Sequence, residues 1–268
     1  MRILTVEETK VALEDHGLDR LQGIGMARRE SHEALFYAWH DHQHHQILFA
    51  RKGTTQVEGQ DGRHLLPAGH ALWIPARTRH RTMIRDLDGL SLFLDAEVVV
   101  GSCETICVFP VSPVLQEMLF HVVRWSEGSL DPDPLARSCF QTLALMVQEV
   151  IGNAEKQAFV LPKATRPSLQ RAMDAALLDP GRASLAMALR EAGMSERSFR
   201  RHFDRETGMS WQQWISQARL FHAATLLAQG ESVTRVAVET GYASLSAFAK
   251  AFTRLLGVPP ARFRGQSR

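Results

Sequence analysis

The pattern of apolar and polar positions changes character partway along the chain. From about residue 36 to about residue 100, short apolar stretches alternate with turn residues, of which Gln60-Asp-Gly62 and Pro67-Ala-Gly69 are typical of tight turns between strands. Many short strands with evenly spaced turns predict a small β-barrel or jelly roll. Residues 1–35 give a weaker pattern, in which residues 6–16 are expected to form a short helix without an assigned function.

Beyond residue 110 the apolar residues recur every three to four positions, as they do along one side of an α-helix. Residues 112–126 and 134–151 are therefore expected to be amphipathic helices. The sequence leaves two roles open for them, closing the core of the barrel or pairing between subunits. The prolines at positions 162 and 167 mark a linker over residues 158–167.

The remainder of the chain, residues 168–268, contains the same pattern twice. Each copy has a glycine that can end one helix, two phenylalanines four residues apart, and a second glycine five residues later. The repeated residues are Gly193, Phe199, Phe203 and Gly208 in the first copy and Gly241, Phe248, Phe252 and Gly257 in the second. A turn followed by a short helix, occurring twice, predicts two helix-turn-helix units.

The two predicted units present different outer faces. In the first, the side opposite the phenylalanines carries Arg197, Arg200, Arg201 and Asp204. In the second, the outward side carries Ser246, Lys250, Thr253 and Arg254. Between the units, residues 210–229 predict a helix that spans about 30 Å at ~1.5 Å per residue. Because successive major-groove faces of B-DNA lie ~34 Å apart, this helix can place two reading helices in adjacent grooves.

Charge supports this division of the chain. The net charge is only +2, but residues 1–161 carry 15 Lys and Arg against 21 Asp and Glu, a net charge of −6. Residues 162–268 carry 16 against 8, a net charge of +8. A basic C-terminal half and an acidic N-terminal half indicate that the C-terminal half alone meets a polyanion.

The remaining composition indicates a cytoplasmic protein. No apolar run approaches the ~18 residues that a membrane-spanning helix needs, and acidic residues follow the first few positions too closely for a signal peptide. Three cysteines, Cys103, Cys107 and Cys139, suit a reducing compartment better than a disulfide framework. We expect no membrane partner.

Five motifs within residues 168–264 occur in the order and at the spacing of a known family. They are Glu206-Thr-Gly-Met-Ser210, Trp214-Ile-Ser-Gln-Ala-Arg-Leu220, Ala228-Gln-Gly-Glu-Ser-Val-Thr234, Gly241-Tyr-Ala-Ser-Leu-Ser-Ala-Phe248 and Phe252-Thr-Arg-Leu-Leu-Gly-Val-Pro-Pro260. Together they resemble the AraC/XylS family of bacterial transcription regulators. The resemblance implies a C-terminal unit with two DNA-binding motifs and a variable sensing or dimerisation domain before it. It also implies a double-stranded DNA operator, a small-molecule effector, a homodimer and, for an activator, RNA polymerase as partners.

The resemblance assigns base-reading positions in both helices. They fall on Arg197, Arg200 and Arg201 in the first and on Ser246, Ala247 and Lys250 in the second. Arginine pairs well with O6 and N7 of guanine, so the first helix is expected to prefer sites that contain G. The second helix has fewer donors and is expected to contribute position more than sequence.

A cluster of histidines stands apart from the DNA-binding motifs. Seven of the twelve histidines lie between residues 40 and 80. Alternation along a strand would place His40, His42, His44 and Gln46 on one face, with His80 across from them on a neighbouring strand. The spacing resembles the two metal-binding motifs of cupins, although Gln46 stands where these usually have Glu and Arg77 where they usually have Gly.

The cupin resemblance implies metal ligands at His40, His42, Gln46 and His80, with His44 as a substitute. Three imidazoles can hold Zn, Ni or Fe and leave a position open for a ligand. The same histidines could instead serve as hydrogen-bonding groups in an effector pocket without metal. His45 is expected to face away from the cluster.

These observations predict an α+β chain with four parts. Residues 1–110 form a cupin-like sensor domain, 111–157 a helical connector or dimerisation segment, 158–167 a linker, and 168–268 an all-α domain with two helix-turn-helix motifs. The predicted function is sequence-specific regulation of transcription, controlled by a small molecule or metal, without enzyme activity. A metal-dependent cupin enzyme fused to a DNA-binding domain is the alternative, weakened by the missing acidic ligand. A non-specific architectural DNA binder fits poorly with two spaced reading helices.

Overall fold

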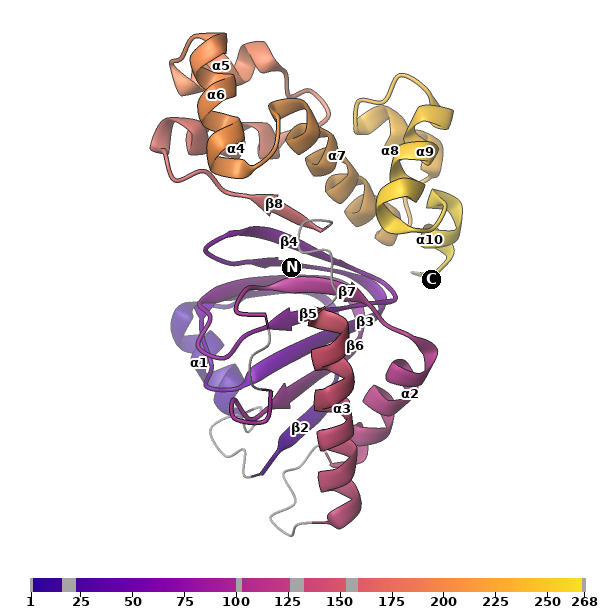
Figure 1. Cartoon of the computed structure of the whole chain (residues 1–268). Coiled ribbons are helices and arrows are strands. Elements are labelled where there is room, and N and C mark those ends of the chain that lie inside the picture. The colour runs from indigo at the N-terminus through magenta and orange to yellow at the C-terminus, as the bar shows by residue number, and fades with distance from the viewer. Residues whose placement is uncertain (1, 16–22, 100–102, 126–132, 153–158, 267–268) are drawn as a thin grey trace. The chain divides into compact units, whose positions relative to one another are not determined.

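The computed structural model describes residues 2–15, 23–99, 103–125, 133–152 and 159–266 (Figure 1). The chain divides into two compact units. The N-terminal unit comprises residues 1–59 and 64–160, and the C-terminal unit comprises residues 60–63 and 161–268. No helix in the described ranges is both long and apolar enough to cross a membrane.

A curved, largely antiparallel sheet forms the centre of the N-terminal unit. Its strands are β1 (Arg2–Ile3), β2 (Gly25–His40), β3 (His45–Glu58), β4 (Gly62–Pro67), β5 (His70–Ile74), β6 (His80–Leu94) and β7 (Cys107–Pro110). β6 lies between β2 and β3 and is antiparallel to both, β5 is antiparallel to β3 and β7, and β1 pairs in parallel with β2. The strand order is an open path, so the predicted barrel is not closed within the described residues.

The sheet bends sharply where β3 and β6 pass each other. Asp86 has a positive φ of 48°, and Gly53, with φ of 78°, has no room for a side chain because its Cβ would lie 2.1 Å from the Asp86 carbonyl oxygen. The pairing of β3 with β6 shifts register at the same place. A bulge of this kind bends a strand and changes which side chains share a face. As a result Ile84 and Ser91, an odd number of residues apart, line the same cavity.

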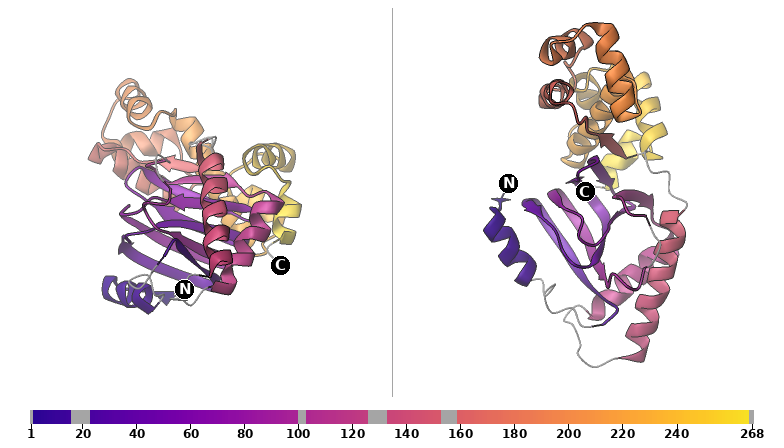
Figure 2. Two further views of the ribbon diagram at one scale, coloured as in Figure 1. Left: turned by 60° about the horizontal axis from the view of Figure 1, so that its bottom comes forward. Right: turned by 60° about the vertical axis from the view of Figure 1, so that its left-hand side comes forward.

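Helices cover both sides of the sheet (Figure 2). On one side, α2 (Pro113–Val122), the short η2 (Val123–Trp125) and α3 (Pro134–Gly152) pack against the strands, and Leu119 and Val147 share a core with Phe49 and Trp73. On the other side lies α1 (Val6–Asp15), whose Leu13 contacts a second apolar cluster. The predicted helices at 112–126 and 134–151 thus close the core of this unit, and pairing between subunits stays a prediction.

From residue 167 onward the C-terminal unit is helical, and the short strand β8 (Val160–Pro162) precedes these helices in the predicted linker. Its helices are α4 (Pro167–Leu178), α5 (Leu185–Ala192), α6 (Glu196–Thr207), α7 (Trp211–Ala228), α8 (Val233–Glu239), α9 (Leu245–Leu256) and α10 (Pro260–Gln266). Serine caps begin most of them, as Ser195 does for α6 and Ser244 for α9. Gly193, Gly208 and Gly257 end helices in the left-handed conformation, as the repeat predicts.

A close backbone approach joins the two helix-turn-helix units. A Cβ on Gly241, which ends α8 at φ of 76°, would lie 2.4 Å from the carbonyl oxygen of Gly181, in the turn before α5. From α7, Arg219 donates hydrogen bonds to the carbonyl oxygens of Pro180 (2.9 Å) and Ala183 (3.1 Å) in the same turn. The turn before α5 is therefore held by both α7 and the end of α8.

This approach predicts that two glycines with similar φ differ in their tolerance of a side chain. Gly257→Ala, with nothing within 4 Å of its Cβ, should cost about 1 kcal/mol for the left-handed conformation alone. Gly241→Ala should cost a further ~1–3 kcal/mol, because its Cβ meets backbone that must move. Urea unfolding of the two variants measures the difference. Equal decreases in the free energy of unfolding would show that the turn at Gly181 moves away from the new Cβ at no cost.

Candidate functional site

The helix α6 presents arginines above an aromatic core. Phe199 and Phe203 are fully buried and stack at 5.4 Å between ring centroids, with Trp211 against both rings. Because the two phenylalanines fix the rotation of the helix, the arginines at positions 197, 200 and 201 face solvent. The structure thus places the three predicted base-reading arginines on one exposed face.

Only weak exposed contacts hold these arginines. Arg200 donates from Nε to Glu196 Oε1 at 2.8 Å, four residues earlier on the helix. Arg201 lies beside His202, at 3.4 Å between Nη2 and Nε2. Exposed ion pairs at this spacing contribute only ~0.3–0.5 kcal/mol, so Glu196 holds the Arg200 side chain weakly.

The helix α9 repeats this arrangement with different chemistry. Phe248 and Phe252 are fully buried, and their ring centroids lie 5.6 Å apart. The predicted reading positions Ser246, Ala247 and Lys250 are exposed. At the predicted reading positions α9 therefore has one cation where α6 has three.

A carboxylate at the end of α6 fixes the start of α4. Glu206 Oε2 accepts hydrogen bonds from the backbone N–H groups of Thr165 and Arg166, both at 2.9 Å. Burial raises the pKa of Glu206, but these donors outweigh it and the net shift is downward. The residue belongs to the Glu206-Thr-Gly motif, and the structure gives that motif a physical role in holding α6 against α4.

The helix α7 joins the two helix-turn-helix units of the C-terminal unit. The helices α4, α5 and α6 lie at one end of it and α8, α9 and α10 at the other (Figure 1). Its 18 residues give a length of about 27 Å. A capping box formed by Ser210 and Gln213 fixes its first turn. This length is close to the predicted one.

In the N-terminal unit, three of the predicted histidines come together. The ring centroids of His40 and His80 lie 4.2 Å apart, and those of His42 and His80 lie 5.2 Å apart. His42 Nε2 lies 3.1 Å from Gln46 Oε1, and Gln46 Nε2 donates to Ser91 Oγ at 3.1 Å. His40 also pairs with His80 in the register of β2 and β6, as the sequence predicts.

The structure differs from the prediction for His44, which does not share a strand face with His40 and His42, and agrees with the prediction that His45 faces away from the cluster. β2 ends at His40 and β3 begins at His45, so the intervening residues do not continue an alternating strand. His44 contributes its backbone carbonyl oxygen, which lies 2.6 Å from His42 Nδ1, and is absent from the lining of the adjacent cavity. His45 stacks on Trp73 at 4.5 Å and accepts a hydrogen bond from the backbone N–H of Ala76.

Burial keeps the three clustered imidazoles neutral. It lowers the pKa of His42 to about 4 and also lowers the pKa values of His40 and His80. Each Nδ1 lies within 2.6–2.8 Å of a backbone carbonyl oxygen, so a neutral ring that donates there carries its proton on Nδ1. For His40 and His80 this leaves a lone pair on Nε2, whereas His42 Nε2 faces a second oxygen, Gln46 Oε1. His80 Nε2 is buried without a hydrogen-bond partner among the described residues.

The loop before His80 keeps a glycine-like conformation without glycine. Arg77 stands where the cupin motif usually has Gly, yet its φ is +60°. Its backbone N–H donates to the His42 carbonyl oxygen at 2.7 Å, and its Nε donates to Gln43 Oε1 at 2.9 Å. These bonds tie the loop after β5 to the residues between β2 and β3.

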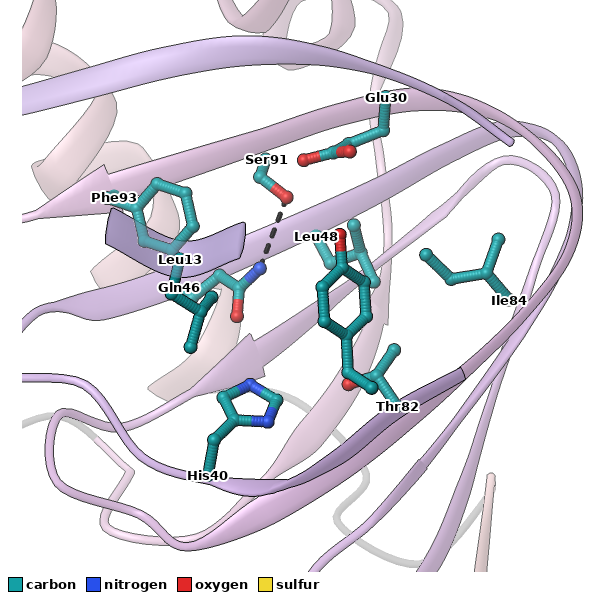
Figure 3. Close-up of a pocket in the computed structure, with 10 residues that line it drawn as sticks. Leu13, Glu30, His40, Gln46, Leu48, Thr82, Ile84, Ser91 and Phe93 are labelled. Atoms are coloured by element: carbon teal, nitrogen blue, oxygen red, sulfur yellow. Dashed lines mark hydrogen bonds between the residues drawn. The ribbon is translucent and has the colours of Figure 1, made fainter. Parts of the chain in front are cut away.

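A cavity with an associated space of about 390 Å³, including part of its opening to solvent, lies beside the histidines (Figure 3). Its polar lining includes Glu30, Tyr37, His40 and Gln46, and its apolar lining includes Leu13, Leu48, Ile84 and Phe93. In Figure 3, Glu30 lies at the top of the view and His40 at the bottom.

The sequence did not predict Glu30 and Tyr37 as pocket residues. Glu30 is only 6% exposed, and its Oε2 lies 2.8 Å from His32 Nε2. Burial, with the Glu30 charge adding to it, raises the pKa of Tyr37 to about 12. The alternating polar residues Arg28, Glu30 and His32 could have indicated a polar strand face.

The metal site stays a prediction. Among the described residues, no group of three or more His, Cys, Asp or Glu side chains is arranged to hold a metal ion. The three imidazoles pack ring against ring, and Gln46 already contacts His42. The tautomers of His40 and His80 nevertheless leave lone pairs on Nε2, the form in which imidazole binds metals.

Two repeated motifs with exposed reading faces, together with a unit that holds a cavity with polar and apolar lining, are the features of a DNA-binding regulator with a ligand-binding domain. A model of the AraC-like ligand binding domain matches residues 23–158, and a model of the helix-turn-helix domain matches residues 188–266. The chain belongs to the AraC family of transcription regulators.

Similar proteins are found among both curated proteins and solved structures. The chain is 26% identical to the HTH-type transcriptional regulator NimR of Escherichia coli K12, over 84% of this chain and 81% of NimR. It is 30% identical to the activator RhaR of Klebsiella pneumoniae, over 50% of this chain and 47% of RhaR. The structure of ToxT from Vibrio cholerae O395 aligns over 91% of this chain and 97% of ToxT, with 12% identity and a TM-score of 0.38.

The buried histidines predict that acid destabilises the N-terminal unit. A histidine whose pKa is lowered in the folded state does not reduce the free energy of unfolding above its unfolded pKa of 6.5. As the pH falls below 6.5, the free energy of unfolding decreases. For His42 alone the loss should approach about 3 kcal/mol near pH 4. Urea unfolding between pH 7.5 and 4.5 measures the slope, which should become shallower in His42→Gln. The exposed-site control His121→Gln should retain the wild-type slope; an unchanged slope in His42→Gln would contradict the assignment.

Proposed function

We propose that this chain binds an operator through α6 and α9 and responds to a small organic molecule in the cavity of the N-terminal unit. The observation that carries the first part is the exposed row of Arg197, Arg200 and Arg201 above two fully buried phenylalanines. These arginines would read guanine, while Ser246, Ala247 and Lys250 would contact a second groove. The setting is the cytoplasm, with no catalytic reaction.

The lining of the cavity supports a particular kind of effector. Glu30 offers carboxylate oxygens and His40 a lone pair on Nε2, and the lining hydroxyls can also accept hydrogen bonds. Leu48 and Phe93 provide an apolar wall. A small amphipathic molecule with hydrogen-bond donors and an apolar body would fit both parts.

A divalent metal, Zn, Ni or Fe, is the second candidate effector. The observation that favours it is the buried His80 Nε2 without a partner among the described residues. His40, His42 and Gln46 would complete the set. A homodimer formed through α2 and α3, and contact with RNA polymerase in an activator, are further parts of the proposal.

The arginine row predicts a loss of specific binding on substitution. Replacing Arg197, Arg200 and Arg201 together by Ala should lower affinity for the operator by at least a hundredfold, because each bidentate guanine contact contributes about 1–3 kcal/mol. A mobility-shift assay at fixed salt, with DNA flanking the gene and a random competitor, measures this change. Arg137→Ala in α3 is the control. Intact specific binding by the triple variant would overturn the site assignment.

The cavity predicts that added bulk blocks the effector but not DNA binding. Ile84→Phe should abolish the rise in Tm that a stabilising compound from a library of small amphipathic molecules gives to the wild type. Zn²⁺, Ni²⁺ and Fe²⁺ are tested separately. Leu145→Phe, at a side chain 67% exposed on α3, is the matched control. A compound that stabilises Ile84→Phe as strongly as the wild type must bind elsewhere.

A further inference from the structure

The first residue of α9 is an exposed leucine. Leu245 directly follows the N-cap Ser244 and is 48% exposed. In the internal repeat it corresponds to Glu196, because each precedes the first buried phenylalanine of its helix by three residues. The two helices thus differ at the position where a recognition helix begins.

The difference extends to the neighbour one turn later. In α6, Glu196 Oε1 accepts a hydrogen bond from Arg200 at 2.8 Å. The position in α9 that corresponds to Arg200 is Ala249, which offers no cation. The first turn of α9 therefore presents an apolar side chain followed by the small residues Ser246 and Ala247, both exposed.

In the major groove only one base edge offers an apolar group. Thymine carries the C5-methyl group, and apolar side chains contact it, whereas guanine, adenine and cytosine present hydrogen-bonding atoms alone. The N-terminal residues of a recognition helix are those that approach base edges. An exposed leucine at this position is consequently suited to thymine and not to a phosphate.

We propose that Leu245 is a specificity-determining residue that packs against a thymine methyl group in the major groove. The first helix would then select guanine through arginine, and the second would select thymine through leucine. This inference rests on the proposed function, since it requires α9 to lie in the groove. It assigns sequence preference to a helix whose other exposed residues supply mainly position.

The expected effect follows from the size of the buried group. Removing one methyl group from an apolar contact costs about 0.8 kcal/mol, which corresponds to about a fourfold loss of affinity. Deoxyuridine differs from thymidine only in lacking this methyl group. Replacing one thymine by uracil therefore removes the proposed contact and leaves every hydrogen-bonding group of the base pair unchanged.

The experiment combines this replacement with a variant of the protein. An operator is selected from a random DNA library, and each thymine is replaced in turn by uracil. Wild-type protein should lose affinity about fourfold at one or two positions in the half-site bound by α9. Leu245→Ala should bind the thymine operator about as weakly and lose nothing further at those positions. Leu178→Ala, at a leucine 88% exposed on α4, should keep the wild-type pattern.

Two results would overturn the inference. Wild-type protein that is insensitive to uracil throughout the second half-site would show that no methyl group is read there. Leu245→Ala that retains the wild-type sensitivity would assign the reading to another residue. Replacing guanine by 7-deazaguanine in the first half-site tests the proposed function separately from this inference. If the proposed function itself failed, the protein would show no specific binding to any operator.

Discussion

Complete burial of two phenylalanines beneath each reading helix is the constraint on which the DNA-binding surface depends. Phe199 and Phe203 under α6, and Phe248 and Phe252 under α9, allow only one rotation of each helix. Turning either helix by one residue would expose an aromatic ring, at a cost of about 1.5–3 kcal/mol for each. The side chains on the opposite face of each helix are therefore the ones that face solvent.

The contact between the two helix-turn-helix units restricts how α6 and α9 can move relative to each other. The turn at Gly181 lies against the end of α8 and accepts hydrogen bonds from Arg219 on α7. The helices that pack against α6 and α9 are therefore in direct contact with one another. Preorganised binding groups lose less conformational freedom on association than independent ones. The glycine at 241 serves this contact, whereas Gly257 only ends a helix.

The C-terminal unit was predictable from sequence because its signals are local. Serine caps, glycine ends and the phenylalanine spacing all act within a few residues, and each predicted helix is present. The N-terminal unit was less predictable because its pocket depends on pairing across the sheet. Residues 25–34 of β2 carry too many charges to resemble a strand, and the bulge at Asp86 reverses the alternation on which a face assignment relies.

The fixed tautomers of the histidines connect the two candidate effectors. Because Nδ1 of His40 and Nδ1 of His80 each face a backbone carbonyl oxygen, Nε2 of these two rings is the atom left to bind either a donor or a metal. Low pKa values keep that lone pair available at neutral pH. Beside it, Glu30 adds a second acceptor with an apolar wall between. A metal would engage the histidines and Gln46, whereas an organic donor would also engage Glu30 at the other end of the cavity, which is why the organic ligand is the first candidate.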